Sequence, residues 1–135
     1  MSPAKRTSKR PVAGSQMDKA CLEVMSNVEG AVACGVVDLA TGELLGFHAL
    51  RRTPALEEAV RAATVALLCR GVAGKGGAAR VALEAHVVSE HGHHFAKVFE
   101  GGKAAVMLVT TRLANAGMGS AQFKAVLPKV EPYVP

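Results

Sequence analysis

Two short apolar runs constrain the fold of this chain more than any other feature. Residues 30–38 read GAVACGVVD, and residues 104–111 read AAVMLVTT. A short apolar run that is rich in valine is typical of a strand covered on both of its faces. We therefore expect these two runs to be the central strands of a sheet.

Two segments have helical periodicity. Residues 16–27 repeat apolar side chains at three- and four-residue steps, with Ser15 as the predicted N-cap and Asp18 near the positive end of the helix. The second helix begins at Thr53-Pro54, an N-cap followed by the first helical position, and Gly71 ends it. Each segment has a start signal as well as helical periodicity, so we predict two helices here.

The second helix is apolar on more than one side. One face carries Leu56, Val60, Ala63 and Leu67, whereas Val65, Leu68 and Cys69 lie largely off that face. Such a helix needs a second covering surface. We interpret that surface as a subunit or partner interface, and a loop of the same chain is the alternative. On this helix Glu57 and Arg61 also have the i,i+4 spacing of an ion pair.

Glycine turns divide the rest of the chain into strands. Leu44–Leu50 forms a hairpin with the first apolar run, through a turn in which Gly42 takes a positive φ. Arg80–Glu90, His94–Glu100 and the second apolar run form an antiparallel meander. Met118–Leu127 is predicted to be a short helix that Pro128 weakens or ends, with residues 131–135 extended beyond it.

The predicted order is therefore helix, two strands, helix, three strands, helix. Five mostly antiparallel strands with helices on the faces of the sheet make an α/β sandwich of the α+β class. The 135 residues suit one domain, which we place at residues 16–135. Residues 1–15 are rich in Pro, Ser, Gly and Lys, and we predict a disordered basic tail there.

Charge and cysteine content narrow the class of function. The net charge is +5, and four of these charges belong to the tail residues Lys5, Arg6, Lys9 and Arg10. Without aromatic residues they are poor evidence for nucleic-acid binding, and we predict none. The three cysteines lack metal or redox spacing, which indicates a reducing compartment. With neither an apolar run of about 18 residues nor a secretory apolar core, we expect a cytoplasmic protein without membrane insertion.

No motif supports catalysis. Residues 71–77 (GVAGKGG) resemble a phosphate loop, but the glycine spacing is wrong and Gly76 stands where the motif needs a hydroxyl. No nucleophile framework and no selected carboxylate pair is present, so we predict neither an enzyme nor a cofactor. Four histidines, His86, His91, His93 and His94, are interpreted as solvent-exposed turn residues; a metal- or proton-responsive site is the alternative.

Three stretches, taken in order, resemble the roadblock/dynein light-chain domain family. They are residues 28–45 (VEGAV, VVD and TGELL), the long helix Leu56–Cys69, and residues 99–117 (FEGGK, VTT and NAG). The resemblance spans residues 16 to about 131. It implies a five-stranded antiparallel sheet in the strand order 2-1-5-4-3, with helices on its faces.

The resemblance also implies dimers formed through the third strand, near Val81–Ser89, and the long helix. The expected dimer-interface residues lie on these two elements: Val81, Leu83, Ala85, Val87, Leu68 and Cys69. Pairing of two copies would join their sheets into one.

The family further implies a function. Its members act as scaffolds and as regulators of Ras-like GTPases, and its bacterial branch includes partners of mutual-gliding (MglB-like) GTPase systems. We therefore expect a non-catalytic homodimeric adaptor or regulator of a small GTPase in bacterial motility or cell polarity. The alternative is a scaffold that links roadblock or polarity proteins without binding a GTPase. Candidate partner-binding residues lie on the long helix: Glu57, Arg61, Thr64, Val65 and Leu68.

Overall fold

The computed structural model describes residues 16–69, 84–90, 92–99 and 102–134. The predicted tail at 1–15 and the glycine-rich segment at 71–77 lie outside the described residues. Residues 16–26 form an N-terminal helix. The elements that follow are β1 (Ala31–Asp38), β2 (Leu44–Ala49), α2 (Pro54–Cys69), β3 (Glu84–Ser89), β4 (Gly92–Val98), β5 (Ala104–Thr110), α3 (Ala116–Val130) and a 3-10 helix (Glu131–Tyr133).

The strands form one antiparallel sheet in the order β2-β1-β5-β4-β3. The two apolar runs are its central strands β1 and β5, as predicted, and every residue of β5 is buried. Gly42 takes φ +77° in the turn between β1 and β2, also as predicted. Both the α+β class and the strand order are therefore confirmed.

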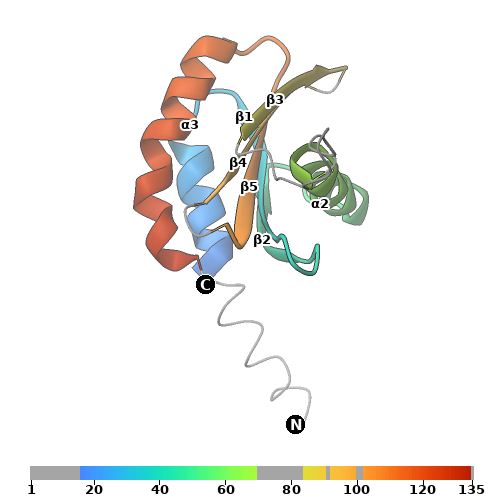
Figure 1. The fold of residues 1–135 in the computed structure, drawn as a ribbon. Coiled ribbons are helices and arrows are strands. Elements are labelled where there is room, and N and C mark those ends of the chain that lie inside the picture. Colours follow the sequence, from blue (N-terminus) through green and yellow to red (C-terminus); the bar gives the residue numbers. More distant parts are fainter. Residues whose placement is uncertain (1–15, 70–83, 91, 100–101, 135) are drawn as a thin grey trace, which may run out of the picture.

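Helices cover both faces of the sheet (Figure 1). The N-terminal helix and α3 lie on one face, here called the two-helix face, and α2 lies on the other, the α2 face. Alternate residues of β5 supply the two cores. Val106 and Leu108 join the core of the two-helix face, whereas Ala105 and Met107 join the core of the α2 face.

A glycine sets the depth at which the N-terminal helix packs. Gly46 of β2 lies so close to Met17 that a Cβ at position 46 would stand 2.3 Å from the Met17 Cβ and 2.7 Å from its carbonyl carbon. No side chain fits in that space. The helix and β2 are thus in backbone contact at this point.

Two cysteines meet beneath the same helix. Cys21 of the helix and Cys34 of β1 are both fully buried free thiols. Burial raises the pKa of Cys34 well above its usual value, and the hydrogen bond and charge repulsion of Cys21 raise it further. The side chain of Cys69, the third cysteine, lies outside the described part of the structure.

The C-terminal helix is longer than predicted. It begins at Ala116 because Asn115 is its N-cap, with Oδ1 accepting a hydrogen bond from the Met118 N–H at 2.9 Å. It also continues through Pro128 to Val130, so the predicted end at Leu127 is wrong and Pro128 does not end the helix. Val130 is 2% exposed, and this burial favours another helical turn.

The extended conformation predicted for the last residues is also wrong, because Glu131–Tyr133 form a 3-10 helix. This turn continues directly from α3, and the Glu131 N–H donates to the Leu127 carbonyl. Within the described residues, no helix combines the length and apolar character needed to cross a membrane.

Candidate protein-interaction surface

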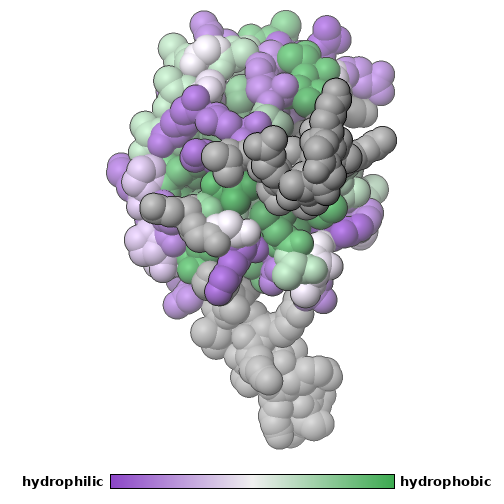
Figure 2. Space-filling model, in the orientation of Figure 1, coloured by the Kyte–Doolittle hydropathy of each residue, from purple (hydrophilic) through white to green (hydrophobic). Residues whose placement is uncertain are grey.

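The strand β3 is an edge of the sheet, because within the described chain it pairs only with β4. Two of its apolar side chains reach the surface, with Val87 38% and Val88 56% exposed. An edge strand presents unpaired N–H and C=O groups to any strand that approaches it. Figure 2 shows one face of the whole molecule, on which hydrophobic and hydrophilic residues are mixed. Hydrophobic residues reach the surface near the middle of this face.

The helix α2 lies next to this edge and contacts β3. Its inward side is fixed by Val60, which is 2% exposed in the α2-face core. Its outward side carries four exposed small residues, spaced by three or four positions: Ala55, Ala59, Ala62 and Ala66. Small side chains permit a second helix to pack at short interaxial distance. The side of α2 away from the core is therefore a surface suited to helix packing.

The N-terminal cap of α2 is the predicted one. The Thr53 Oγ1 accepts a hydrogen bond from the Leu56 N–H at 3.0 Å. Glu57, which was expected to pair with Arg61, instead forms an ion pair with Arg52. The Arg52 guanidinium also lies 5.3 Å from the centre of the Phe47 ring. Its hydrogen bond to Glu57 raises the pKa of Arg52. Glu57 thus secures the chain entering α2.

Arg61 ties α2 to the turn between β1 and β2. Its Nε donates to the Glu58 Oε1 at 3.0 Å, and its Nη1 donates to the Gly42 carbonyl at 2.9 Å. The hydrogen bond with Glu58 raises the pKa of Arg61. Val65 lies beside the same turn. The predicted Glu57–Arg61 pair is therefore wrong, because each side chain finds a nearer partner of opposite charge.

Thr64 does not reach the surface on which the sequence analysis placed it. It is 0% exposed, and its hydroxyl donates to the Val60 carbonyl at 2.7 Å. This hydrogen bond within the helix satisfies a polar group in the core of the α2 face. We therefore leave Thr64 out of the partner surface. The side chain of Leu68 lies outside the described residues.

The residues expected at the dimer interface fall into three groups. Val87 is exposed on β3, and Ala85 is half-buried against the core beneath α2. Val81 and Leu83 precede the described part of β3, and the side chains of Leu68 and Cys69 lie outside the described structure. What the structure brings together is an exposed strand edge and the helix beside it.

His86, His93 and His94 lie in strands, which corrects the interpretation of these histidines as turn residues. His86 of β3 and His93 of β4 meet on the two-helix face, where Nε2 of the first is 3.2 Å from Nδ1 of the second. His94 points to the opposite face, and its Nε2 is 2.9 Å from the Ser89 Oγ. His91 lies outside the described residues.

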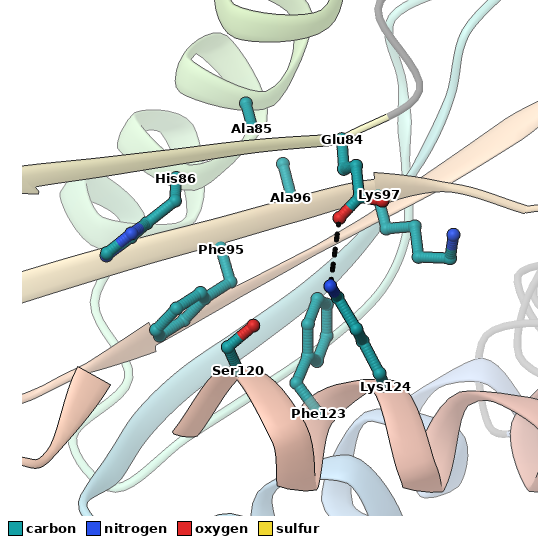
Figure 3. A pocket seen from close by; sticks show the side chains of 9 residues that line it. All are labelled: Glu84, Ala85, His86, Phe95, Ala96, Lys97, Ser120, Phe123 and Lys124. Carbon is teal, nitrogen blue, oxygen red and sulfur yellow. Dashed lines mark ion pairs between the residues drawn. The ribbon is translucent and has the colours of Figure 1, made fainter. Parts of the chain in front are cut away.

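A groove lies beside this histidine pair, between the β3–β4 hairpin and α3 (Figure 3). The Phe95 and Phe123 rings lie inside it, and their centres are 6.1 Å apart. Glu84 and Lys124 form an ion pair across it, with 3.5 Å between Oε1 and Nζ. Its volume of about 150 Å³ is smaller than a typical small-molecule site of roughly 300 Å³ or more. The groove has room for a side chain rather than for a nucleotide.

Comparison with solved structures defines the class of fold. A roadblock/LC7 domain from Streptomyces avermitilis aligns with a TM-score of 0.68 at 18% identity, covering 86% of this chain and 95% of that one. Myxococcus xanthus MglB aligns with a TM-score of 0.65 at 12% identity, covering 90% and 92%. MglC from the same organism aligns with a TM-score of 0.60 at 19% identity, covering 88% and 99%.

The chain therefore has the roadblock/LC7 fold, as the sequence resemblance predicted. The two Mgl proteins are among its structural neighbours. The sequence itself matches no established family profile and no curated protein.

Proposed function

We propose that this chain is a non-catalytic, homodimeric adaptor or regulator of a Ras-like small GTPase system in the bacterial cytoplasm. The observation that carries the proposal is the juxtaposition of the free β3 edge with α2 and its exposed alanines. The fold shared with MglB and MglC supports assigning this pair of elements to protein–protein contact.

In the proposed dimer, β3 pairs with β3 of a second copy and the two α2 helices pack side by side. Edge pairing satisfies the outward backbone groups of β3 and covers Val87. The alanines on the outside of α2 let the second helix approach closely. Because α2 lies next to β3, one interface between two copies can contain both the strand pairing and the helix packing.

The GTPase would contact the part of α2 that lies at the β1–β2 turn. Glu58 and Arg61 hold a surface ion pair there, and Val65 is partly exposed beside them. In this proposal the chain positions groups of its partner and supplies no reacting group of its own. Motility or cell polarity is the process we propose, following the resemblance to the mutual-gliding branch.

The proposal is tested by mixing the full chain with a Ras-like GTPase of the mutual-gliding type, loaded with GDP or with a non-hydrolysable GTP analogue. Binding that depends on the nucleotide supports a regulator. A hydrolysis assay then shows whether the chain activates GTP hydrolysis or serves only as an adaptor. Absence of binding in both nucleotide states contradicts the GTPase partnership and favours the scaffold alternative, in which the chain links other roadblock proteins.

Two charge-reversal variants sharpen this test. Arg61→Glu removes the side chain between α2 and the β1–β2 turn, and it should weaken GTPase binding at least tenfold. Lys129→Glu, on the exposed side of α3, makes the same charge change on the other face of the sheet and should leave binding unchanged. Equal losses in both variants would show that net charge, rather than this surface, governs the association.

A further inference from the structure

We propose that His86 and His93 are half of a transition-metal site, of the kind that binds Zn²⁺, and that a second copy of the chain supplies the other half. The inference rests on the β3 pairing of the proposed function. It adds a ligand at the interface and names the residues that hold it.

The spacing of the two imidazoles fits a shared metal ion. Two histidine nitrogens bound to one tetrahedral zinc at about 2.0–2.1 Å stand about 3.3 Å apart. His86 Nε2 and His93 Nδ1 are 3.2 Å apart. Small rotations of the rings would turn both lone pairs toward a common point. The metal would then replace the hydrogen bond that joins the two rings.

The second ring nitrogen of His93, Nε2, makes a hydrogen bond that orients the ring for metal binding. His93 Nε2 lies 3.3 Å from the Arg112 carbonyl oxygen. Because a carbonyl only accepts hydrogen bonds, the proton sits on Nε2 and the lone pair is on Nδ1, which faces His86. Metal-binding histidines are commonly oriented by such a hydrogen bond to a backbone carbonyl.

Aromatic packing fixes the position of His86. Its ring stacks on Phe95, with ring centres 4.5 Å apart and an angle of 9° between the planes. Phe95 is 3% exposed and packs against Phe123 of α3. His86 itself is exposed, so an ion from solvent can reach it. The pair is therefore both preorganised and accessible.

The described residues of one chain provide too few ligands. Among the described residues, no group of three His, Cys, Asp or Glu side chains is placed to hold an ion. A zinc site with two protein ligands is incomplete, since structural sites normally have four. The missing ligands must come from outside this part of the chain, and the free β3 edge is where a second copy would approach.

The pleat of β3 restricts how a second copy can supply them. Successive residues of a strand point to opposite faces, and residues opposite each other in an antiparallel pair share a face. His86 can therefore face only Glu84, His86 or Val88 of a second β3. The register centred on His86 pairs residues 84–88 of both copies and brings the two His86 side chains opposite each other. All four imidazoles then lie on the two-helix face, with the two His86 rings at the centre of the pairing and one His93 on either side of it.

The test is titration of the full chain with Zn²⁺, with bound metal measured after size exclusion and the mass measured by light scattering. We expect one zinc per two chains and at least a tenfold tighter dimer with zinc. His86→Phe keeps a ring on Phe95 without the nitrogen, so it should abolish this zinc binding while the fold is retained. His93→Ala should do the same, whereas His48→Ala, at the far edge of the sheet on β2, should have no effect.

The possible outcomes separate this inference from the proposed function. A dimer that binds no zinc, or binds it equally well in both histidine variants, overturns the metal site and leaves the β3 pairing intact. Zinc bound one per chain by a monomer overturns the shared site and the β3 pairing together. A single zinc per dimer that is lost in both variants supports the two proposals jointly.

Discussion

The Asp18 Oδ1 accepts a hydrogen bond from the backbone N–H of Phe47 at 2.8 Å. Asp18 belongs to the N-terminal helix, and Phe47 belongs to β2, the edge strand at the opposite end of the sheet from β3. The carboxylate satisfies a donor on β2, which pairs with no strand but β1 among the described residues. The two edges of the sheet therefore differ. A side chain of the same molecule contacts the β2 edge, whereas β3 has no second partner strand among the described residues.

We predict that Asp18→Ala lowers the free energy of unfolding by about 1–2 kcal/mol, since hydrogen bonds to charged groups are worth more than neutral ones. Asp18→Asn retains a weaker acceptor and should cost less. Urea denaturation measures both. Lys19→Ala, an exposed neighbour on the same helix, is the control and should be close to neutral. Equal stability of Asp18→Ala and the wild type would contradict a role for this hydrogen bond.

Gly46→Ala should destabilise the domain by about 1–3 kcal/mol, because the added methyl group overlaps Met17 and the N-terminal helix must move away. Gly117→Ala, in the first turn of α3, is the matched control. Its methyl group would meet nothing closer than the Asn115 Oδ1 at 3.4 Å, and alanine favours the helix. Thermal unfolding followed by circular dichroism compares the two, and a lower Tm for Gly117→Ala than for Gly46→Ala would refute this reasoning.

The ion pair between Glu58 and Arg61 predicts a small pH dependence of stability. The hydrogen bond from Arg61 lowers the pKa of Glu58. A carboxyl group with a lowered pKa in the folded state stabilises the fold above its unfolded pKa of about 4.3, and this contribution is lost as the pH falls through the folded value. Glu58→Gln should therefore be less stable than the wild type at neutral pH, and the difference should vanish in acid.

This difference should be modest, because the pair is exposed to solvent. Urea denaturation at a series of pH values measures it. In an Arg61→Met background, Glu58→Gln should have no such pH-dependent effect. A pH-dependent difference that persists without Arg61 would assign the effect to another partner of Glu58.

Pro128→Ala should stabilise the domain by about 1–2 kcal/mol. Proline in a helix removes one backbone hydrogen bond and crowds the preceding turn, and its stiffening of the unfolded chain offsets only part of this cost. Pro128 is exposed, so the substitution removes no core contact. Denaturant titration measures the change. A loss of stability would mean that Pro128 holds the start of the 3-10 helix rather than straining α3.

Local sequence patterns were sufficient for the central strands and for the start of α2. These features depend on residues that are close together in the sequence: the valine-rich runs at 30–38 and 104–111, and the Thr53 cap. They could therefore be predicted one segment at a time. Pro128 shows where such reasoning fails. Its local preference ends a helix, but burial of Val130 against the core continues it.

The candidate site was less predictable because it depends on contacts between distant segments. Glu57 and Arg61 have the spacing of a pair, but Arg52 and Glu58 lie closer once the chain is folded. His86 and His93 are seven residues apart and meet only because their strands pair. Strand pairing also separates His93 from its neighbour His94, since adjacent residues of a strand face opposite ways.

The central claim, that two copies pair through β3 and α2, is tested most directly by the solution mass of the full chain, measured by size exclusion with light scattering in the presence of a metal chelator. We predict a mass of twice the 13.9 kDa of one chain. Ala62→Glu, on the outward side of α2, should convert this dimer to a monomer, whereas Lys129→Glu should not. A wild-type chain that remains a 13.9 kDa monomer at all concentrations would contradict the account.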